Sequence, residues 1–231
     1  MPVSSDTAEK HDSASAANSR ASTGVYRTVR FIALVACKLY FRLSIEGKEN
    51  IPRSGPFVLA PIHRSNLDTL VSSTLSTRFM RFMAKSNMFT TKAGAWFIGS
   101  LGGFPVHRGS ADREALTLCT DILASGQPVV LFPEGTRQTG PLIGDIFDGA
   151  AYVAAKANVP IIPVGIGGSE RAMKKGSPLV RPVKIHVVIG KPIMPPDKVN
   201  GRVARHAVKE LTTTLHEQLQ ELFDQAQVRA G

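Results

Sequence analysis

Short apolar runs rich in β-branched and aromatic residues alternate with segments of helical periodicity along most of this 231-residue chain. This alternation constrains the fold more than any other feature, because it is typical of layered α/β proteins. The predicted strands span residues 43–46, 57–60, 81–84, 104–106, 129–132, 161–166 and 185–189. The predicted helices span residues 67–75, 93–101, 111–124, 149–157 and 201–226. Because a chain of this length needs only one core, we expect a single α/β domain over residues 44–231, with a mixed central β-sheet flanked by helices.

The first 43 residues differ in composition from the rest. Residues 1–24 are rich in Ser, Ala, Thr and Asn, and their few large apolar side chains cannot offset the entropy lost on ordering, which predicts a disordered tail. Residues 25–43 mix apolar with basic side chains, as expected of an interfacial amphipathic helix in the lipid headgroup plane. The alternative is a helix that covers the domain's own core. Basic and aromatic anchors at both ends favour the membrane interface. The basic residues are Arg27, Arg30, Lys38 and Arg42.

The charge balance predicts an anionic partner. The chain carries 28 Lys and Arg against 18 Asp and Glu, a formal net charge of +10. Nucleic acid, an anionic membrane surface, phosphorylated metabolites and an acidic carrier protein all fit this charge. The basic residues are scattered and no RNP, zinc-finger or helix-turn-helix signature is present, so nucleic acid is not the expected partner. No apolar run approaches the roughly 18 residues of a spanning helix.

The cysteines indicate neither a disulfide framework nor a metal centre. Cys37 and Cys119 are the only two, and they lie far apart without metal-ligand spacing. The segment LVAC at residues 34–37 resembles a lipoprotein cleavage box, but the apolar run before it is too short for an export signal. We therefore expect a protein that works at the cytoplasmic face of the cell membrane, monotopic or peripheral.

The first motif that carries chemistry is HRSNLD at residues 63–68, directly after a predicted strand. Histidine, with a reference pKa of about 6.5, suits proton abstraction near neutrality. Asp68 can fold back onto one imidazole nitrogen of His63, which would fix the tautomer and make the other nitrogen the better base. The alternative is a loop histidine beside a helix N-cap formed by Asn66 or Asp68.

The segment GGFPVHRG at residues 102–109 has a glycine pair that permits a tight turn before a short strand delivers Arg108. The guanidinium of Arg108 could clamp a phosphate. An exposed arginine in a hairpin-like turn explains the pattern equally well. His107 has no second carboxylate or cysteine nearby to suggest a ligand set.

The segment FPEGTR at residues 132–137 closes an apolar strand, at the end where α/β proteins place ligands. Arg137 offers a planar fork of donors that suits phosphate, and Glu134 could orient that fork or a substrate hydroxyl. Gly135 shapes the backbone between them. A bare surface turn rarely combines these features, which favours a functional loop over a structural one.

The segment VPIIPV at residues 159–164 is predicted to be a buried strand that packs the wall of the site. Pro163 within it indicates an irregular or edge position, because proline cannot donate to a sheet ladder.

The order and spacing of these four segments resemble the four sequence blocks of the glycerolipid acyltransferase family, which includes the 1-acylglycerol-3-phosphate (lysophosphatidate) acyltransferases. The resemblance covers about residues 40–195. It implies direct transfer of an acyl group from acyl-CoA or acyl carrier protein to a lysophospholipid hydroxyl, with no acyl-enzyme and no metal or organic cofactor. His63 would be the general base and Asp68 its orienter. The implied substrate-binding residues are Arg108, Glu134, Gly135, Thr136 and Arg137.

Several alternatives remain open at this level. Ile62 stands where the family often has Asn, and His107 precedes the arginine of the second block, so the acceptor could be glycerol 3-phosphate, another lysophospholipid or a glycolipid. A serine hydrolase using Ser65 is a rival reading, although no G-x-S-x-G elbow is present. A nucleic-acid-binding module and a membrane scaffold without activity are more distant alternatives.

Overall fold

The computed structural model describes residues 20–106, 113–198 and 203–231, and its centre is a seven-stranded sheet. The order in the sheet is β1-β7-β6-β2-β5-β3-β4. Neighbouring strands are parallel except for β6 and β7, which are antiparallel. The predicted mixed central sheet is therefore confirmed. The strands are β1 (Ser44–Glu46), β2 (Val58–Pro61), β3 (Arg81–Lys85), β4 (Gly103–Val106), β5 (Val129–Val130), β6 (Ile161–Gly167) and β7 (His186–Ile189).

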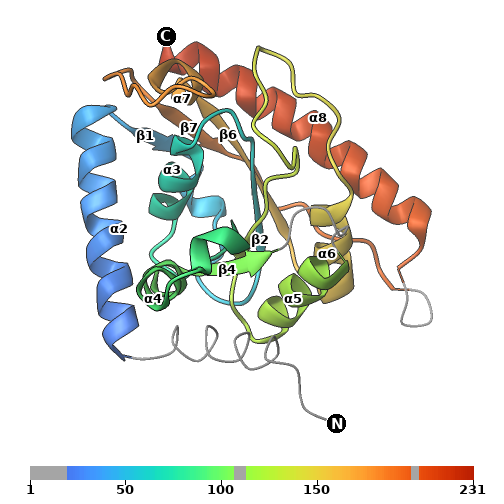
Figure 1. Ribbon diagram of the computed structural model, residues 1–231. Coiled ribbons are helices and arrows are strands. Elements are labelled where there is room, and N and C mark those ends of the chain that lie inside the picture. The colour runs from blue at the N-terminus through green and yellow to red at the C-terminus, as the bar shows by residue number, and fades with distance from the viewer. Residues whose placement is uncertain (1–19, 107–112, 199–202) are drawn as a thin grey trace.

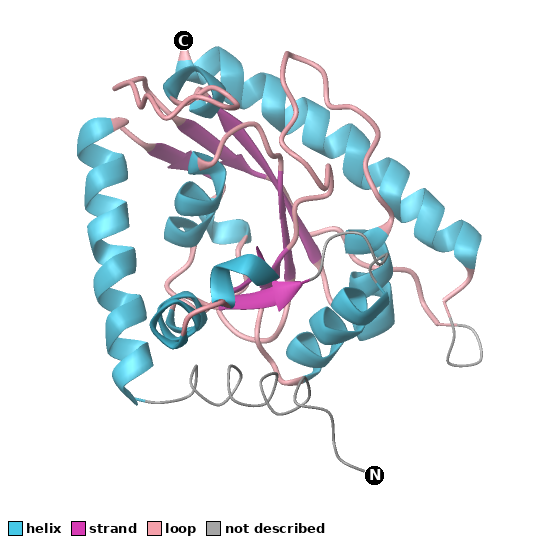
Figure 2. Cartoon of the chain, in the orientation of Figure 1, coloured by secondary structure: helices cyan, strands magenta, loops and turns pink. Residues whose placement is uncertain are grey.

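Helices cover both faces of this sheet. In Figure 1, α2, α3 and α4 lie to the left of the sheet and α5, α6 and α8 to its right, and Figure 2 shows the strands enclosed between the two groups. The α-helices are α2 (Arg20–Tyr40), α3 (Leu67–Leu75), α4 (Lys92–Ser100), α5 (Arg113–Ala124), α6 (Gly149–Ala157), α7 (Ser169–Ala172) and α8 (Arg205–Ala230). Two 3₁₀ turns, η1 (Lys48–Asn50) and η2 (Ser86–Phe89), complete the described elements.

Most predicted elements form within a few residues of their expected bounds. Helices α3 and α6 coincide with the prediction, whereas α8 is displaced toward the C-terminus by about one turn. Strand β5 ends at Val130, two residues before the predicted end, although the Leu131 N–H still donates to the Leu59 carbonyl of β2 at 2.9 Å. The short α7 and the two 3₁₀ turns were not expected, since single turns carry too little periodicity to be recognised.

The central strands are buried on both faces. All four residues of β2, all seven of β6 and all four of β7 are buried. Pro163 lies in the interior strand β6, so an edge position is excluded, but its place is irregular as expected. Regular pairing of β6 with β7 ends at Val164 and Ile189, and an isolated bridge joins Ile161 to Ile193. Pro163 lies between these two paired positions, where its lack of a backbone N–H leaves no ladder hydrogen bond unmade.

Helix α2 packs one face against the domain, as the alternative of a core-covering helix predicts, and leaves another face exposed. Tyr26, Ala33 and Cys37 are buried against the domain, while other apolar side chains of the helix are exposed. The helix begins at Arg20, so the disorder predicted for residues 20–24 is wrong; elongating a formed helix costs far less than nucleating one. Residues 1–19 of the predicted tail lie outside the described residues. The helix ends at Tyr40 because Arg42 adopts a left-handed conformation with φ 47°.

No helix among the described residues is long and apolar enough to span a bilayer.

Candidate active site

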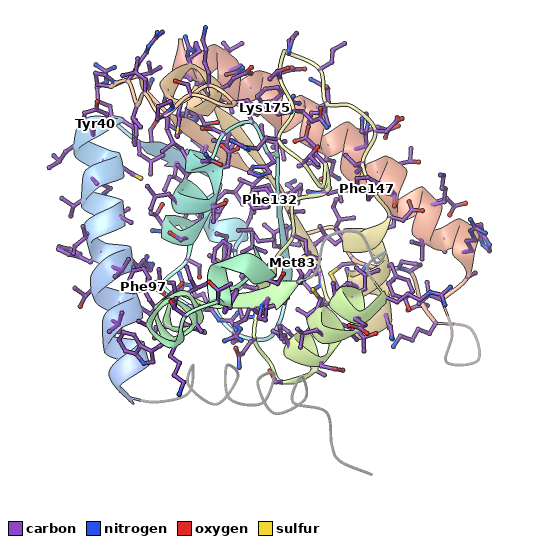
Figure 3. All side chains as sticks on the ribbon, in the orientation of Figure 1. Tyr40, Met83, Phe97, Phe132, Phe147 and Lys175 are labelled. Carbon is purple, nitrogen blue, oxygen red and sulfur yellow. The ribbon has the colours of Figure 1, made fainter. Side chains whose placement is uncertain are left out.

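Two of the motifs meet beyond the carboxyl ends of two neighbouring strands. His63 follows β2, and the segment 132–137 follows β5, which is the parallel neighbour of β2. Parallel strands place the loops after their C-terminal ends side by side. The Phe132 ring, labelled near the centre of Figure 3, stacks on the imidazole of His63 with a centroid separation of 4.2 Å. The backbone N–H of Gln138 donates to the His63 carbonyl at 2.9 Å and joins the two loops.

His63 and Asp68 form a base and orienter pair. His63 Nδ1 lies 3.2 Å from Asp68 Oδ2, with the side chain of His63 17% exposed and that of Asp68 fully buried. A carboxylate at Nδ1 favours the tautomer with the proton on that nitrogen, which leaves Nε2 free to accept a proton. The structure thus brings together the two residues that the sequence predicts as base and orienter.

Asp68 is held by the loop that it orients. Its Oδ2 atom also accepts the backbone N–H groups of Arg64 at 2.5 Å and Ser65 at 2.6 Å. Asn66, the residue before α3, makes no side-chain capping bond. Asp68 therefore fixes the backbone of the turn that carries His63, as well as its ring.

Glu134 supports the same turn from the other side. The backbone N–H of His63 donates to Glu134 Oε2 at 2.6 Å, and Glu134 Oε1 lies 3.1 Å from Arg64 Nη2, although not aligned as a hydrogen bond. Burial raises the pKa of the Glu134 carboxyl, and the His63 N–H and the Arg64 charge oppose that rise. The structure places Glu134 beneath the His63 turn rather than against Arg137.

The residues after Glu134 lie closer to solvent. Gly135 has φ +65°, and a Cβ there would lie 2.7 Å from the Phe147 ring, so the turn requires glycine. Thr136 is exposed, and its hydroxyl accepts a hydrogen bond from Gln138 at 3.2 Å. Arg137 is half-buried, and within the described ranges no hydrogen bond or ion pair engages its side chain. Its guanidinium is available for an anion.

Arg108 and His107 lie outside the described residues.

Ser65 is unsuited to act as a nucleophile. Its side chain is fully buried, and its hydroxyl donates to the Met173 carbonyl at 2.8 Å instead of facing His63. A serine nucleophile must hydrogen-bond to its base and reach the substrate. The geometry removes the support for the serine hydrolase alternative.

Arg64 had no predicted role, but in the structure it lies against Glu134, the carboxylate that accepts the His63 N–H. It is 1% exposed and pairs with Glu134, and buried arginines in proteins are paired. An acidic residue in the neighbouring motif was the available signal, but only the fold shows that the two side chains meet.

No cluster of three His, Cys, Asp or Glu side chains suited to a metal ion occurs in the described part of the chain. Cys37 and Cys119 are buried, and burial raises the pKa of their thiols to about 11 and about 12. Neither thiol is activated for chemistry at neutral pH.

Comparisons with known proteins identify relatives of this chain. A chloroplastic 1-acyl-sn-glycerol-3-phosphate acyltransferase of Arabidopsis thaliana is 32% identical over 158 residues, 67% of this chain and 44% of that protein. A 1-acyl-sn-glycerol-3-phosphate acyltransferase of Bacillus subtilis is 24% identical over 181 residues, 78% of this chain and 87% of that protein. The chain spans about half the length of the plant and algal relatives that it matches.

The fold is also shared with a solved structure. The crystal structure of the 1-acyl-sn-glycerophosphate acyltransferase from Thermotoga maritima superposes with a TM-score of 0.70 at 24% identity, covering 85% of this chain and 78% of that one. The model of the Acyltransferase family matches residues 42–167, which contain the His63, Asp68 and Glu134 cluster. Because this match covers more than half of the chain, the protein belongs to the acyltransferase family.

Proposed function

We propose that this protein is an O-acyltransferase that moves a fatty acyl group from acyl-CoA or acyl carrier protein to the free hydroxyl of 1-acylglycerol 3-phosphate, giving phosphatidate in phospholipid biosynthesis. The contact of His63 Nδ1 with the buried Asp68 carboxylate carries this proposal, because it leaves Nε2 as a base beside the Arg137 loop. The matched relatives are themselves named 1-acyl-sn-glycerol-3-phosphate acyltransferases, which supports the choice of acceptor.

The reaction needs only a base and a bound thioester. His63 Nε2 takes the proton of the acceptor hydroxyl as its oxygen attacks the thioester carbonyl carbon. The C–O bond forms, the C–S bond breaks, and the imidazolium returns the proton to the departing thiolate. Asp68 stabilises the transient positive charge on the ring. The substrate's own hydroxyl takes the place that a serine holds in a hydrolase.

The proposed site for the acceptor phosphate includes Arg137, the residue before Gln138, whose backbone N–H donates to the His63 carbonyl. Arg137 follows the Glu134 turn and is free of protein partners within the described ranges. A planar guanidinium suits bidentate binding of phosphate. We propose that Arg137, with Arg108, Gly135 and Thr136, binds the glycerol phosphate.

The proposed working place is the anionic face of the cell membrane on the cytoplasmic side. Helix α2 exposes Phe31 (64%), Ile32 (59%) and Leu39 (78%), which form one face of the helix opposite its buried stripe. Helix α4, beside α2 in Figure 1, adds Trp96 and Phe97, which are also exposed. Apolar side chains flanked by basic ones suit the lipid interface, as does a net charge of +10.

The test is a thiol-release assay with long-chain acyl-CoA and, separately, acyl carrier protein. Each donor is combined with lysophosphatidate, glycerol 3-phosphate, another lysophospholipid or no acceptor. We expect release that depends on lysophosphatidate and that falls roughly 100-fold or more in His63→Ala, the usual scale for losing a general base. Arg137→Ala should chiefly raise the acceptor KM.

Each outcome decides a different part of the proposal. Release with a different acceptor would leave the chemistry in place and overturn the substrate. A folded His63→Ala protein with near-normal activity would overturn the assignment of the base. Absence of release with either donor and every acceptor would overturn the enzymatic function.

A further inference from the structure

Arg64 is a fully buried charge that the proposed chemistry does not use. Its side chain is 1% exposed, and its guanidinium lies between three groups from different parts of the chain. Nη2 is 3.1 Å from Glu134 Oε1 and donates to the Leu142 carbonyl at 3.0 Å, while Cζ lies 4.9 Å from the centre of the Phe223 ring. Because desolvating a guanidinium is costly, such a burial persists only where its partners are fixed.

The partner of Arg64 holds the backbone of the base. Glu134 Oε2 accepts the His63 N–H at 2.6 Å while Oε1 faces Arg64. On the other side of the turn, Asp68 accepts from the backbone of Arg64 and from the ring of His63. The segment that carries the base is therefore held between two buried carboxylates, and among the described residues only Glu134 has an arginine or lysine side chain directly against it.

We propose that Arg64 is a positioning residue for acyl transfer: by fixing the Glu134 carboxylate, it sets the backbone of His63 and thereby the place of Nε2 against the acceptor hydroxyl. This inference rests on the proposed function and deepens it. It also moves Glu134 from the acceptor site to the support of the base.

The positive charge of Arg64 is the property that keeps Glu134 ionised. The titratable groups that face Glu134 are Arg64, His63 and Asp68. Burial already raises the pKa of Glu134, and Arg64 counters the rise, so Glu134 without Arg64 would take up a proton at a higher pH. A neutral carboxyl holds the His63 N–H more weakly than a carboxylate does.

A readout independent of turnover is the backbone amide of His63 in a ¹⁵N-labelled protein. Its chemical shift follows the protonation of Glu134, to which it donates. We expect the midpoint of that titration to rise in Arg64→Gln and to stay near the wild-type value in Arg64→Lys, which keeps the charge. An unchanged midpoint in Arg64→Gln would overturn the inference, whether or not the protein transfers acyl groups.

The kinetic readout separates positioning from general loss of stability. Misplacing a base by about 1 Å costs on the order of 100-fold, so kcat of Arg64→Gln should fall by 10-fold to 100-fold with little change in KM. The loss should deepen as the pH falls, and Arg64→Lys should restore the acid side of the profile. Arg81→Gln is the matched control. Arg81 is also a buried arginine, but it is the first residue of β3, whereas the site lies beyond the carboxyl ends of β2 and β5.

A second variant keeps the test decisive if Arg64→Gln does not fold. The double variant Arg64→Gln, Glu134→Gln removes both charges and so leaves no unpaired ion in the core. We expect it to fold and to show reduced kcat without the added loss at low pH. A double variant with wild-type kcat would overturn the positioning role. Wild-type protein that is inactive with every donor and acceptor would instead overturn the proposed function.

Discussion

The lack of a side chain at Gly165 allows α8 to pack closely against the sheet, and a Gly165→Ala variant tests this packing. In β6, a Cβ added at residue 165 would lie 2.3 Å from the Leu222 carbonyl oxygen, 2.4 Å from its carbonyl carbon and 2.7 Å from the Phe223 nitrogen. These are backbone atoms of α8 and cannot swing aside, whereas ordinary contacts of a Cβ begin at 3.4 Å. In Gly165→Ala the helix must therefore move away from the sheet by about 1 Å.

The expected loss follows from that displacement. Overpacking of a filled interior costs about 1–3 kcal/mol, and the α8 face that moves carries the buried side chains of Leu215, Leu219 and Phe223. Because those side chains lose dispersion contacts as the gap opens, we expect the upper end, about 3 kcal/mol. For a domain of this size, this corresponds to a Tm lower by about 6–12 °C.

Thermal unfolding followed by far-UV circular dichroism, with urea denaturation as a second measure, checks this value. Gly144→Ala is the control, since a Cβ there meets nothing within 4 Å and its φ is not left-handed. Its unfolding free energy should change by less than about 1 kcal/mol. If Gly165→Ala melted within 2 °C of the wild type, on the scale of about 1 kcal/mol or less, the close seating of α8 would be refuted.

Three further changes probe the site and its surroundings. Asp68→Asn keeps the shape but removes the charge that stabilises the His63 imidazolium, so kcat should fall by roughly 100-fold or more, and steady-state rates equal to wild type would contradict its role. Ser65→Ala should keep most of the activity, because the Ser65 hydroxyl is engaged by the Met173 carbonyl; complete loss in a folded protein would restore the hydrolase reading. His186 has a pKa lowered by burial, so the unfolded chain takes up its proton first as the pH falls. The stability that neutral His186 contributes is complete above the unfolded-state pKa of about 6.5 and is lost as the pH falls toward the lower pKa of the folded state. A plot of Tm against pH should therefore be flatter in this range for His186→Gln than for the wild type. Equal slopes would contradict the lowered pKa of His186.

Local periodicity was sufficient to predict the seven strands and most of the longer helices of the fold. The segments 67–75 and 149–157 form helices with the predicted bounds, because their apolar spacing and flanking residues act over a few turns of chain. Each of the seven predicted strands is present, and only β5 is shorter by two residues. Helix α2 was less well predicted, since its start depends on elongation into a polar segment and its end on the backbone of Arg42.

The candidate site was predictable where its partners are near in sequence. Asp68 lies five residues after His63, so one turn of chain is enough to bring the two side chains together. Glu134 was predicted to be part of the site, but as a residue that binds the acceptor. Its contact with His63 was not predicted, because the two residues are separated by 71 positions in the sequence. Arg64 had no predicted role for the same reason.

The α/β class, the positions of most elements and the pairing of His63 with Asp68 were predictable from the amino-acid sequence, because each depends on short-range spacing and intrinsic residue chemistry. The position of β2 between β5 and β6 is a property of the folded chain, and this strand order brings the loops after β2 and β5 together. The folded chain also buries Glu134 and Arg64 as a pair beneath the base. Contacts of this kind depend on which distant segments become neighbours, and a charged side chain is buried only where another part of the chain supplies its partner.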